Sequence, residues 1–186
     1  MPRKAPAVAR SHAPHAPRAA RKATSIVSSS HQVSPRSAEL GEFEFGLVVA
    51  WNAFSRWAMR CMAAAGVGDL TITDVLLLHH VSHRARNKKL ADICFVLNYE
   101  DTHVVAYSLK KLVGAGLVLT EKVGKEVLYS PTPEGEAAVI AYRRVREQCL
   151  VQSLDTELNA PIGELARLLR TMSGMYDQAA RAASSL

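Results

Sequence analysis

The chain has 186 residues, 48% of them apolar, which is enough for one domain with a sizeable core and an added segment. Its formal charge of +6 is unevenly placed, because seven of the 23 Lys and Arg precede Glu39 and no acidic residue does. Residues 39–186 therefore carry sixteen basic and seventeen acidic groups, which excludes an overall basic surface on the folded part.

Residues 1–38 contain five of the eight prolines and few larger aliphatic side chains. Such a segment buries too little apolar surface to offset the entropy of ordering it, so a disordered basic arm is expected. Two interpretations stay open: a solubilising tail, and an arm that lies along an anionic polymer and makes binding salt-dependent. No apolar run follows the basic residues, which argues against a secretory signal, although organelle transit peptides share this composition.

A long helix is predicted over residues 42–65, where apolar residues recur at steps of three and four from Phe43 to Ala65. Glu44, Arg56 and Arg60 interrupt this stretch, so it reads as a buried helix rather than a membrane span. The apolar face is broader than one core contact requires. A second copy of the chain is the simplest cover for it, and a central helix within one monomer is the alternative.

Three shorter helices are predicted next. Thr71 and Asp74 form a capping-box pattern that opens the first, and Asn87 is expected to cap the second. Asp101 caps the third, which runs to about Val113 after a turn over residues 98–101. The side chains expected to face inward are Val75, Leu76, Leu78 and Val81 on the first, Leu90, Ile93 and Cys94 on the second, and Val105, Leu109 and Leu112 on the third.

Gly114 and Gly116 end the third helix, and the runs LVLTEK (117–122) and KEVLYS (125–130) predict two strands. Gly124 between them permits the positive φ of a tight hairpin. Thr132 and Pro133 predict the start of a helix that runs to about Ser153, and a last helix begins near residues 159–161. Its apolar stripe comprises Ile162, Leu165, Leu168, Leu169, Met172, Met175 and Tyr176.

From Thr71 onward the predicted order is helix, short helix, tight turn, helix, hairpin, helix, which is the order of a winged helix-turn-helix. The stretch KKLADICFVLNYEDTHVVAYSLKKLVGAGLV (88–118) resembles MarR-type regulators. The matching features are the Leu90-Ala91 pair, the turn at 98–101, the polar Thr102-His103 opening, Lys111-Leu112, the Ala-Gly-Leu-Val exit at 115–118 and a Thr-x-x-Gly at 132–135.

The resemblance implies a mainly α fold with a small β-hairpin wing, in which a winged helix-turn-helix is joined to long terminal dimerisation helices. The expected parts are a disordered basic arm at 1–38, a helical dimerisation region at 39–70 and 132–182, and a DNA-binding region at 71–131. It further implies a homodimeric transcriptional regulator in the cytoplasm, associated with the nucleoid, that reads a near-palindromic duplex site. A small-molecule effector of unknown identity is expected between the dimerisation and DNA-binding parts.

Candidate DNA contacts follow from the outward positions of the helix at about 101–113 and of the wing at about 117–130. We predict that Thr102, His103 and Tyr107 contact bases or nearby sugars, and that Lys110, Lys111, Lys122 and Lys125 contact the phosphate backbone. Ala106 is also expected on this outward, DNA-binding face. The family wing usually carries an Asp-x-Arg-Asp-x-Arg stretch, whereas this shorter hairpin offers only Lys122 and Lys125. The lysines can instead complement a helix dipole or solvate a hairpin tip.

The alternative function is a winged-helix module that dimerises or binds a protein and has lost DNA binding, which the near-neutral folded part favours. An enzyme is not expected, because the sequence has no nucleophile elbow, P-loop, zinc-hydrolase or paired-Cys motif. No cofactor or metal is predicted either. His79 and His83 have a metal-compatible spacing, but surface or hydrogen-bonded histidines are favoured. Cys61, Cys94 and Cys149 are interpreted as reduced core thiols.

Overall fold

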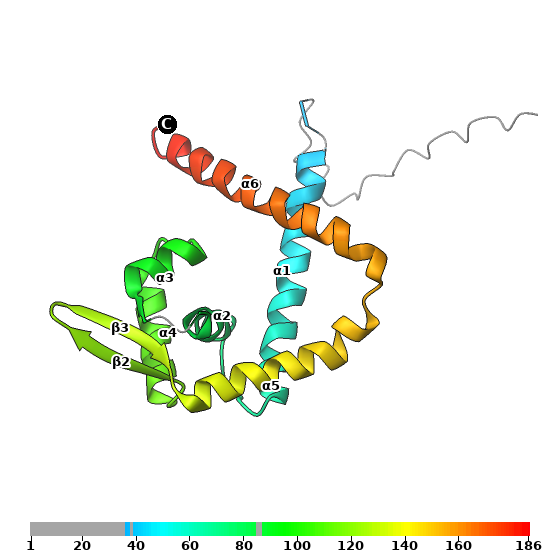
Figure 1. Cartoon of the computed structure of the whole chain (residues 1–186). Helices are drawn as coiled ribbons and strands as arrows, with labels where there is room; N and C mark the ends of the chain where they lie inside the picture. The colour runs from blue at the N-terminus through cyan, green and yellow to red at the C-terminus, as the bar shows by residue number, and fades with distance from the viewer. Residues whose placement is uncertain (1–35, 38, 85–86) are drawn as a thin grey trace, which may run out of the picture. The chain divides into compact units, whose positions relative to one another are not determined.

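The computed structural model of the chain describes residues 36–37, 39–84 and 87–186 (Figure 1). Nearly all of the predicted basic arm therefore lies outside the described residues. The chain divides into two units, residues 1–50 and 51–186, and α1 (Glu39–Ala64) spans their boundary. The other elements belong to the second unit: α2 (Ile72–Ser82), β1 (Lys88–Lys89), α3 (Leu90–Leu97), α4 (Thr102–Gly114), β2 (Val118–Val123), β3 (Glu126–Pro131), α5 (Pro133–Cys149), the 3-10 turns η2 (Val151–Ser153) and η3 (Thr156–Leu158), and α6 (Asn159–Ala183).

The predicted mainly α fold with a winged helix is confirmed, with one correction to its sheet. The described residues form a three-stranded antiparallel sheet in the order β1-β3-β2, where a two-stranded hairpin was expected. Lys88 pairs with Tyr129 and Lys89 with Leu128, so both lysines are held in extended backbone before α3. The cap of α3 is therefore Lys89, and the prediction that Asn87 caps this helix is wrong.

The core lies where α2, α3 and α4 pack with the last turns of α1 and the first turns of α5. The predicted inward residues of α4 are confirmed, as are Ile93 and Cys94 of α3, while Leu90 is half-buried. On α2 the prediction of Leu76 is wrong, because Leu77 is buried and Leu76 is only half-buried. Both α4 and α5 contact α2, so two sides of this helix are covered. The prediction assumed a single inward-facing stripe and therefore chose Leu76 in place of Leu77.

Two chain reversals fix the position of α4. Its end forms a Schellman motif, in which Leu117 N donates to Leu112 O at 3.0 Å and Gly116 N donates to Val113 O at 3.0 Å. Gly116 has a φ of +72° there, whereas Gly114 lies within the helix. Before α4, Asn98 takes the same left-handed role with a φ of +55° at the end of α3. Each reversal requires a residue that tolerates positive φ.

The Thr-x-x-Gly motif joins the end of α4 to the start of α5. Thr132 Oγ1 accepts from Gly135 N at 2.9 Å and donates to Gly116 O at 2.7 Å. A Cβ on Gly135 would lie 2.1 Å from the carbonyl oxygen of Leu117, so only glycine lets the two backbones approach this closely. The motif is therefore explained by packing and hydrogen bonds within the fold.

The long helices at the two ends of the chain differ from the core helices. On α1, Ala58, Cys61 and Met62 are buried, whereas its earlier apolar residues Leu47, Val48, Val49, Trp51 and Phe54 are exposed. The prediction of a buried helix therefore holds only for its end. Helix α5 stops four residues before the predicted Ser153, and Cys149 at its end is exposed instead of buried. Within the described residues, no helix combines the length and the apolar character needed to cross a bilayer.

Candidate nucleic-acid interface

The outer face of α4 carries the side chains predicted to approach DNA. Asp101 caps the helix by accepting from His103 N at 2.8 Å, and the side chains of Thr102 and His103 are exposed. Tyr107 is 76% exposed and projects as a large aromatic group one turn further on, while Ala106 is half-buried. Four exposed or half-buried residues of contrasting chemistry thus lie in the first turns of one exposed helix.

Lys110 and Lys111 are neighbours on α4 but have different surroundings. Lys110 is exposed. Lys111 Nζ lies 2.8 Å from Asp74 Oδ2 and 2.6 Å from the carbonyl oxygen of Asp69, and 36% of its side chain is exposed. The Lys111 ammonium is therefore engaged by the protein itself, on the side of α4 that faces α2.

Asp74 is the buried acceptor at this contact and is only 2% exposed. Besides Lys111, its carboxylate accepts from Thr71 N at 2.8 Å and from the Ser108 hydroxyl. Burial by itself would raise the pKa of Asp74, but the hydrogen bonds from Lys111, Ser108 and Thr71 outweigh it and hold that pKa below its ordinary value. The predicted capping box of Thr71 and Asp74 is confirmed, and it forms part of a larger network.

Sequence reasoning missed this network. Ser108 lies three residues after Val105 and four before Leu112, so helical periodicity alone places it on the inward face. Its buried partner Asp74 is 34 residues away in the chain, and no local pattern indicates that the two meet. The signal available from the sequence was a hydroxyl on an otherwise apolar face.

In the wing, Lys122 and Lys125 are both exposed, and Gly124 turns the hairpin with a φ of +62°. The wing also carries acids. Glu126 forms an ion pair with Lys89 at 2.6 Å, and Glu121 accepts from Asn87 at 3.2 Å. By the strand register, Glu121 and Glu126 share one face of the sheet and Lys122 lies on the other. The acids are therefore tied to the segment before α3 and are not aligned with Lys122.

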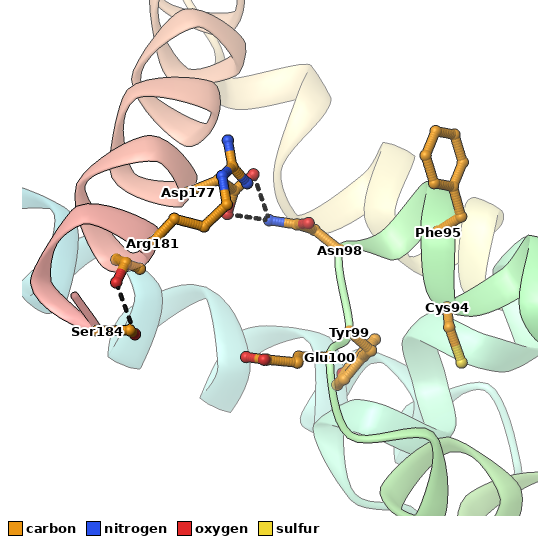
Figure 2. A pocket seen from close by; sticks show the side chains of 9 residues that line it. Cys94, Phe95, Asn98, Tyr99, Glu100, Asp177, Arg181 and Ser184 are labelled. Carbon is orange, nitrogen blue, oxygen red and sulfur yellow. Dashed lines mark hydrogen bonds between the residues drawn. The ribbon is translucent and has the colours of Figure 1, made fainter.

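A groove of about 490 Å³ lies between the α3–α4 turn and α6. Figure 2 shows Asn98 pointing from the turn toward Asp177 of α6, to which its amide donates at 3.3 Å. Arg181 and Glu100 add charges to the lining, and Phe95, which is 86% exposed, adds an aromatic ring. The groove thus combines apolar and charged walls, as small-molecule sites do.

His79 and His80 lie in the last turn of α2, and His83 caps its end. Among the described residues, no group of three or more His, Cys, Asp or Glu could hold a metal ion. His79 packs edge-on against the ring of Tyr142, with ring centroids 4.4 Å apart, and its burial lowers its pKa. His79 is half-buried, and its Nε2 is buried without a hydrogen-bond partner in the described part of the chain.

Residues 70–135 match the family model described as a winged helix DNA-binding domain, and they span the capping box, α2 to α4, the sheet and the Thr-x-x-Gly motif. This part of the chain has a winged helix fold and is similar in sequence to the domains that the family model describes. The matched residues include the helices and strands whose order predicted a winged helix-turn-helix. Among curated proteins, none matches the chain.

Solved structures place the winged helix domain of this chain in a wider fold that MarR-type regulators share. A probable transcriptional regulator from Pseudomonas aeruginosa is 24% identical, with 64% of this chain and 93% of that chain covered and a TM-score of 0.50. AbfR of Staphylococcus epidermidis is 18% identical, with 73% and 92% covered and a TM-score of 0.61. A MarR family protein from Listeria monocytogenes, solved with a 26mer DNA, is 16% identical, with 69% and 85% covered and a TM-score of 0.58. The predicted resemblance is thus confirmed for the fold.

Proposed function

We propose that the protein is a homodimeric transcriptional regulator that binds duplex DNA through α4 and the wing, in the cytoplasm and associated with the nucleoid. One observation carries the proposal: within the winged helix DNA-binding domain, α4 buries Val105, Leu109 and Leu112 and leaves the opposite face of its first turns exposed. A helix held in this way can place its start in the major groove while the hairpin reaches the neighbouring backbone.

Roles follow from position and chemistry. Thr102, His103 and Tyr107 are assigned to base edges or nearby sugars, with Ala106 close enough to pack on them. Lys110, Lys122 and Lys125 are assigned to phosphates, because each is an exposed cation on α4 or the wing. Lys111 is left out of the phosphate contacts, since its ammonium is bound to Asp74 and Asp69. The basic arm is assigned salt-dependent, sequence-independent affinity.

The homodimer is supported by the exposed apolar stripe of α6. Ile162, Leu165, Leu168, Leu169 and Met175 are all exposed along this helix, and none of its residues, all of which lie in the described part, is buried. A continuous stripe of this kind marks a protein interface. Two copies related by a two-fold axis would present two α4 helices about 34 Å apart, which suits half-sites one helical turn apart.

The groove between the α3–α4 turn and α6 is assigned to the effector. It lies where the helix that carries the dimer stripe touches the turn that precedes α4, through Asn98 and Asp177. A molecule bound there would change this contact, and with it the placement of α4. A ligand can act in this way only if it binds the DNA-binding arrangement of α4 with a different affinity from the other arrangement.

The experiment is selection of bound sites from a random duplex library, followed by titration of the selected site at several salt concentrations. Selected sites should be near-palindromic. Tyr107→Ala should lower affinity for the selected site more than for random duplex, and Lys110→Ala should lower both and flatten the salt slope by about one. Arg144→Ala is the matched control, because Arg144 is an exposed cation on α5, outside α4 and the wing.

The second candidate is a protein-interaction module without DNA binding, favoured by the near-neutral charge of residues 39–186. A chain that begins at Glu39 separates the two candidates, because it lacks the basic arm. Retardation of duplex by this shortened chain at low salt supports the regulator. Its absence, with the fold intact by circular dichroism, supports the module.

A further inference from the structure

We infer that Lys111 acts inside the protein as a cation that positions the recognition helix, with Asp74 as its buried counter-ion, and that it makes no contact with phosphate. The inference rests on the proposed function, because it concerns how α4 is presented to DNA. It assigns different roles to Lys110 and Lys111, which are adjacent on α4, have the same charge and cannot be told apart from the sequence.

The geometry accounts for most of the hydrogen-bonding capacity of Lys111. Its ammonium has three donors, of which one meets Asp74 Oδ2 at 2.8 Å and another meets the Asp69 carbonyl at 2.6 Å. Contact with a phosphate would require the ammonium to leave both partners. Because Asp74 is only 2% exposed, this would also leave a buried carboxylate without its counter-ion.

The contact joins three segments of the chain. Lys111 lies on α4, Asp74 on α2, and Asp69 in the linker between α1 and α2. Asp69 has a φ of +58°, which is uncommon for a residue other than glycine, and in this conformation its carbonyl accepts from Lys111. The lysine thus ties α4 both to the helix beside it and to the linker that leads into that helix.

Ser108 adds a second point of attachment one turn earlier on α4. Its hydroxyl donates to Asp74 Oδ1, while Lys111 and Thr71 N occupy Oδ2. Two donors three residues apart on α4 therefore bind the two oxygens of one carboxylate. Apolar contacts between two helices allow small rotations and shifts of one helix along the other. Hydrogen bonds to both oxygens of one carboxylate are directional, so they fix the position of α4 along α2. The best-established role of buried polar groups is to fix how two elements align, and their net contribution to stability is smaller.

The test compares Lys110→Met with Lys111→Met in full-length protein, each titrated against the selected duplex over a range of salt concentrations. Lys110→Met should reduce the salt slope by about one, because one released counterion is lost. Lys111→Met should lower affinity equally at every salt concentration and leave the slope unchanged. A slope reduced by about one in Lys111→Met, as in Lys110→Met, would overturn the inference.

Lys111→Met leaves Asp74 unpaired and could unfold the domain, so Asp74→Asn/Lys111→Met is the second variant. It removes both charges, and replacing a buried ion pair as a whole is far better tolerated than breaking it. This variant should fold and keep the parent salt slope, with weaker binding than the parent because the register is relaxed. Parent affinity in the folded double variant, or a reduced slope, contradicts the inference. No duplex binding by the parent would instead refute the proposed function.

Discussion

The winged helix domain and α6 use apolar residues in opposite ways. In the domain, the inward faces of α2, α3 and α4 are buried against one another and against the ends of α1 and α5. In α6, the apolar side chains of Ile162, Leu165, Leu168, Leu169 and Met175 are exposed, and Asn98 of the α3–α4 turn donates to Asp177 of the helix. The domain therefore buries its apolar side chains within one chain, whereas α6 leaves most of its apolar side chains exposed.

The largest effect is expected from placing charge on the stripe of α6. Leu165→Glu/Leu168→Glu should give monomers by sedimentation, because two carboxylates cannot be buried unpaired in an apolar interface. Each monomer would then bind one half-site, so affinity for the palindromic duplex should fall about 100-fold or more as the linked second site is lost. The winged helix domain should keep its fold.

The control for this pair is Arg170→Glu, which makes the same change in net charge on the opposite face of the helix. It should remain a dimer with near-parent affinity. Persistent dimers in the double variant would show that the stripe is not the dimer interface. The exposed apolar residues of α6 would then need another explanation.

Within the domain, Gly135→Ala should be the most disruptive single methyl group. Its Cβ would lie 2.1 Å from the Leu117 carbonyl, so the backbone must shift where α5 meets the end of α4, at a cost of about 3 kcal/mol in the free energy of unfolding. Gly163→Ala on α6 is the matched control, since its Cβ would meet nothing within 4 Å and alanine favours a helix by about 0.5–1 kcal/mol. Urea titration of both variants measures the difference, and equal midpoints would contradict the close approach.

The same contrast explains how far the sequence could predict the structure. Local signals were sufficient for the helix caps at Thr71, Asp101 and Thr132, because each cap depends on residues within three positions. They did not indicate that Lys88 and Lys89 form a third strand, since that pairing depends on Tyr129 and Leu128, about forty residues later.

The candidate site was predicted on the same terms. Periodicity correctly gives the inward residues of α4, and the side chains of Thr102, His103 and Tyr107 are left exposed as expected. Residues 110 and 111 are both lysine, so the sequence alone does not show that their surroundings differ. Only the position of α2 shows that one of them faces a buried carboxylate, and a contact between residues 37 positions apart has no local signature.

A smaller effect is expected from Asp74→Asn, and it should depend on pH. Because the folded-state pKa of Asp74 is depressed, its ionised form contributes stability above the unfolded-state pKa of about 3.9, and this contribution is lost as pH falls through the folded value. At pH 7 the variant should therefore be less stable by about 2 kcal/mol, as for a lost charged hydrogen bond. The difference from the parent should shrink in acid. A constant difference in urea titrations from pH 7 down to pH 3 would contradict the role of the ionised carboxylate.

The smallest effect is expected at Asn98, where α6 meets the domain. Asn98→Gly keeps a residue that tolerates the φ of +55° and removes the amide that donates to Asp177 at 3.3 Å. Since the contact is exposed and long, unfolding of the domain should change by about 0.5 kcal/mol or less. Asn98→Gly should nevertheless make amide exchange in α6 faster when it is added to the monomeric Leu165→Glu/Leu168→Glu variant, because it removes the bonds from Asn98 to Ser173 and Asp177 that tie α6 to the turn before α4. Unchanged exchange there would mean that α6 is ordered by other contacts, and a large loss of domain stability would mean that α6 is part of the core after all.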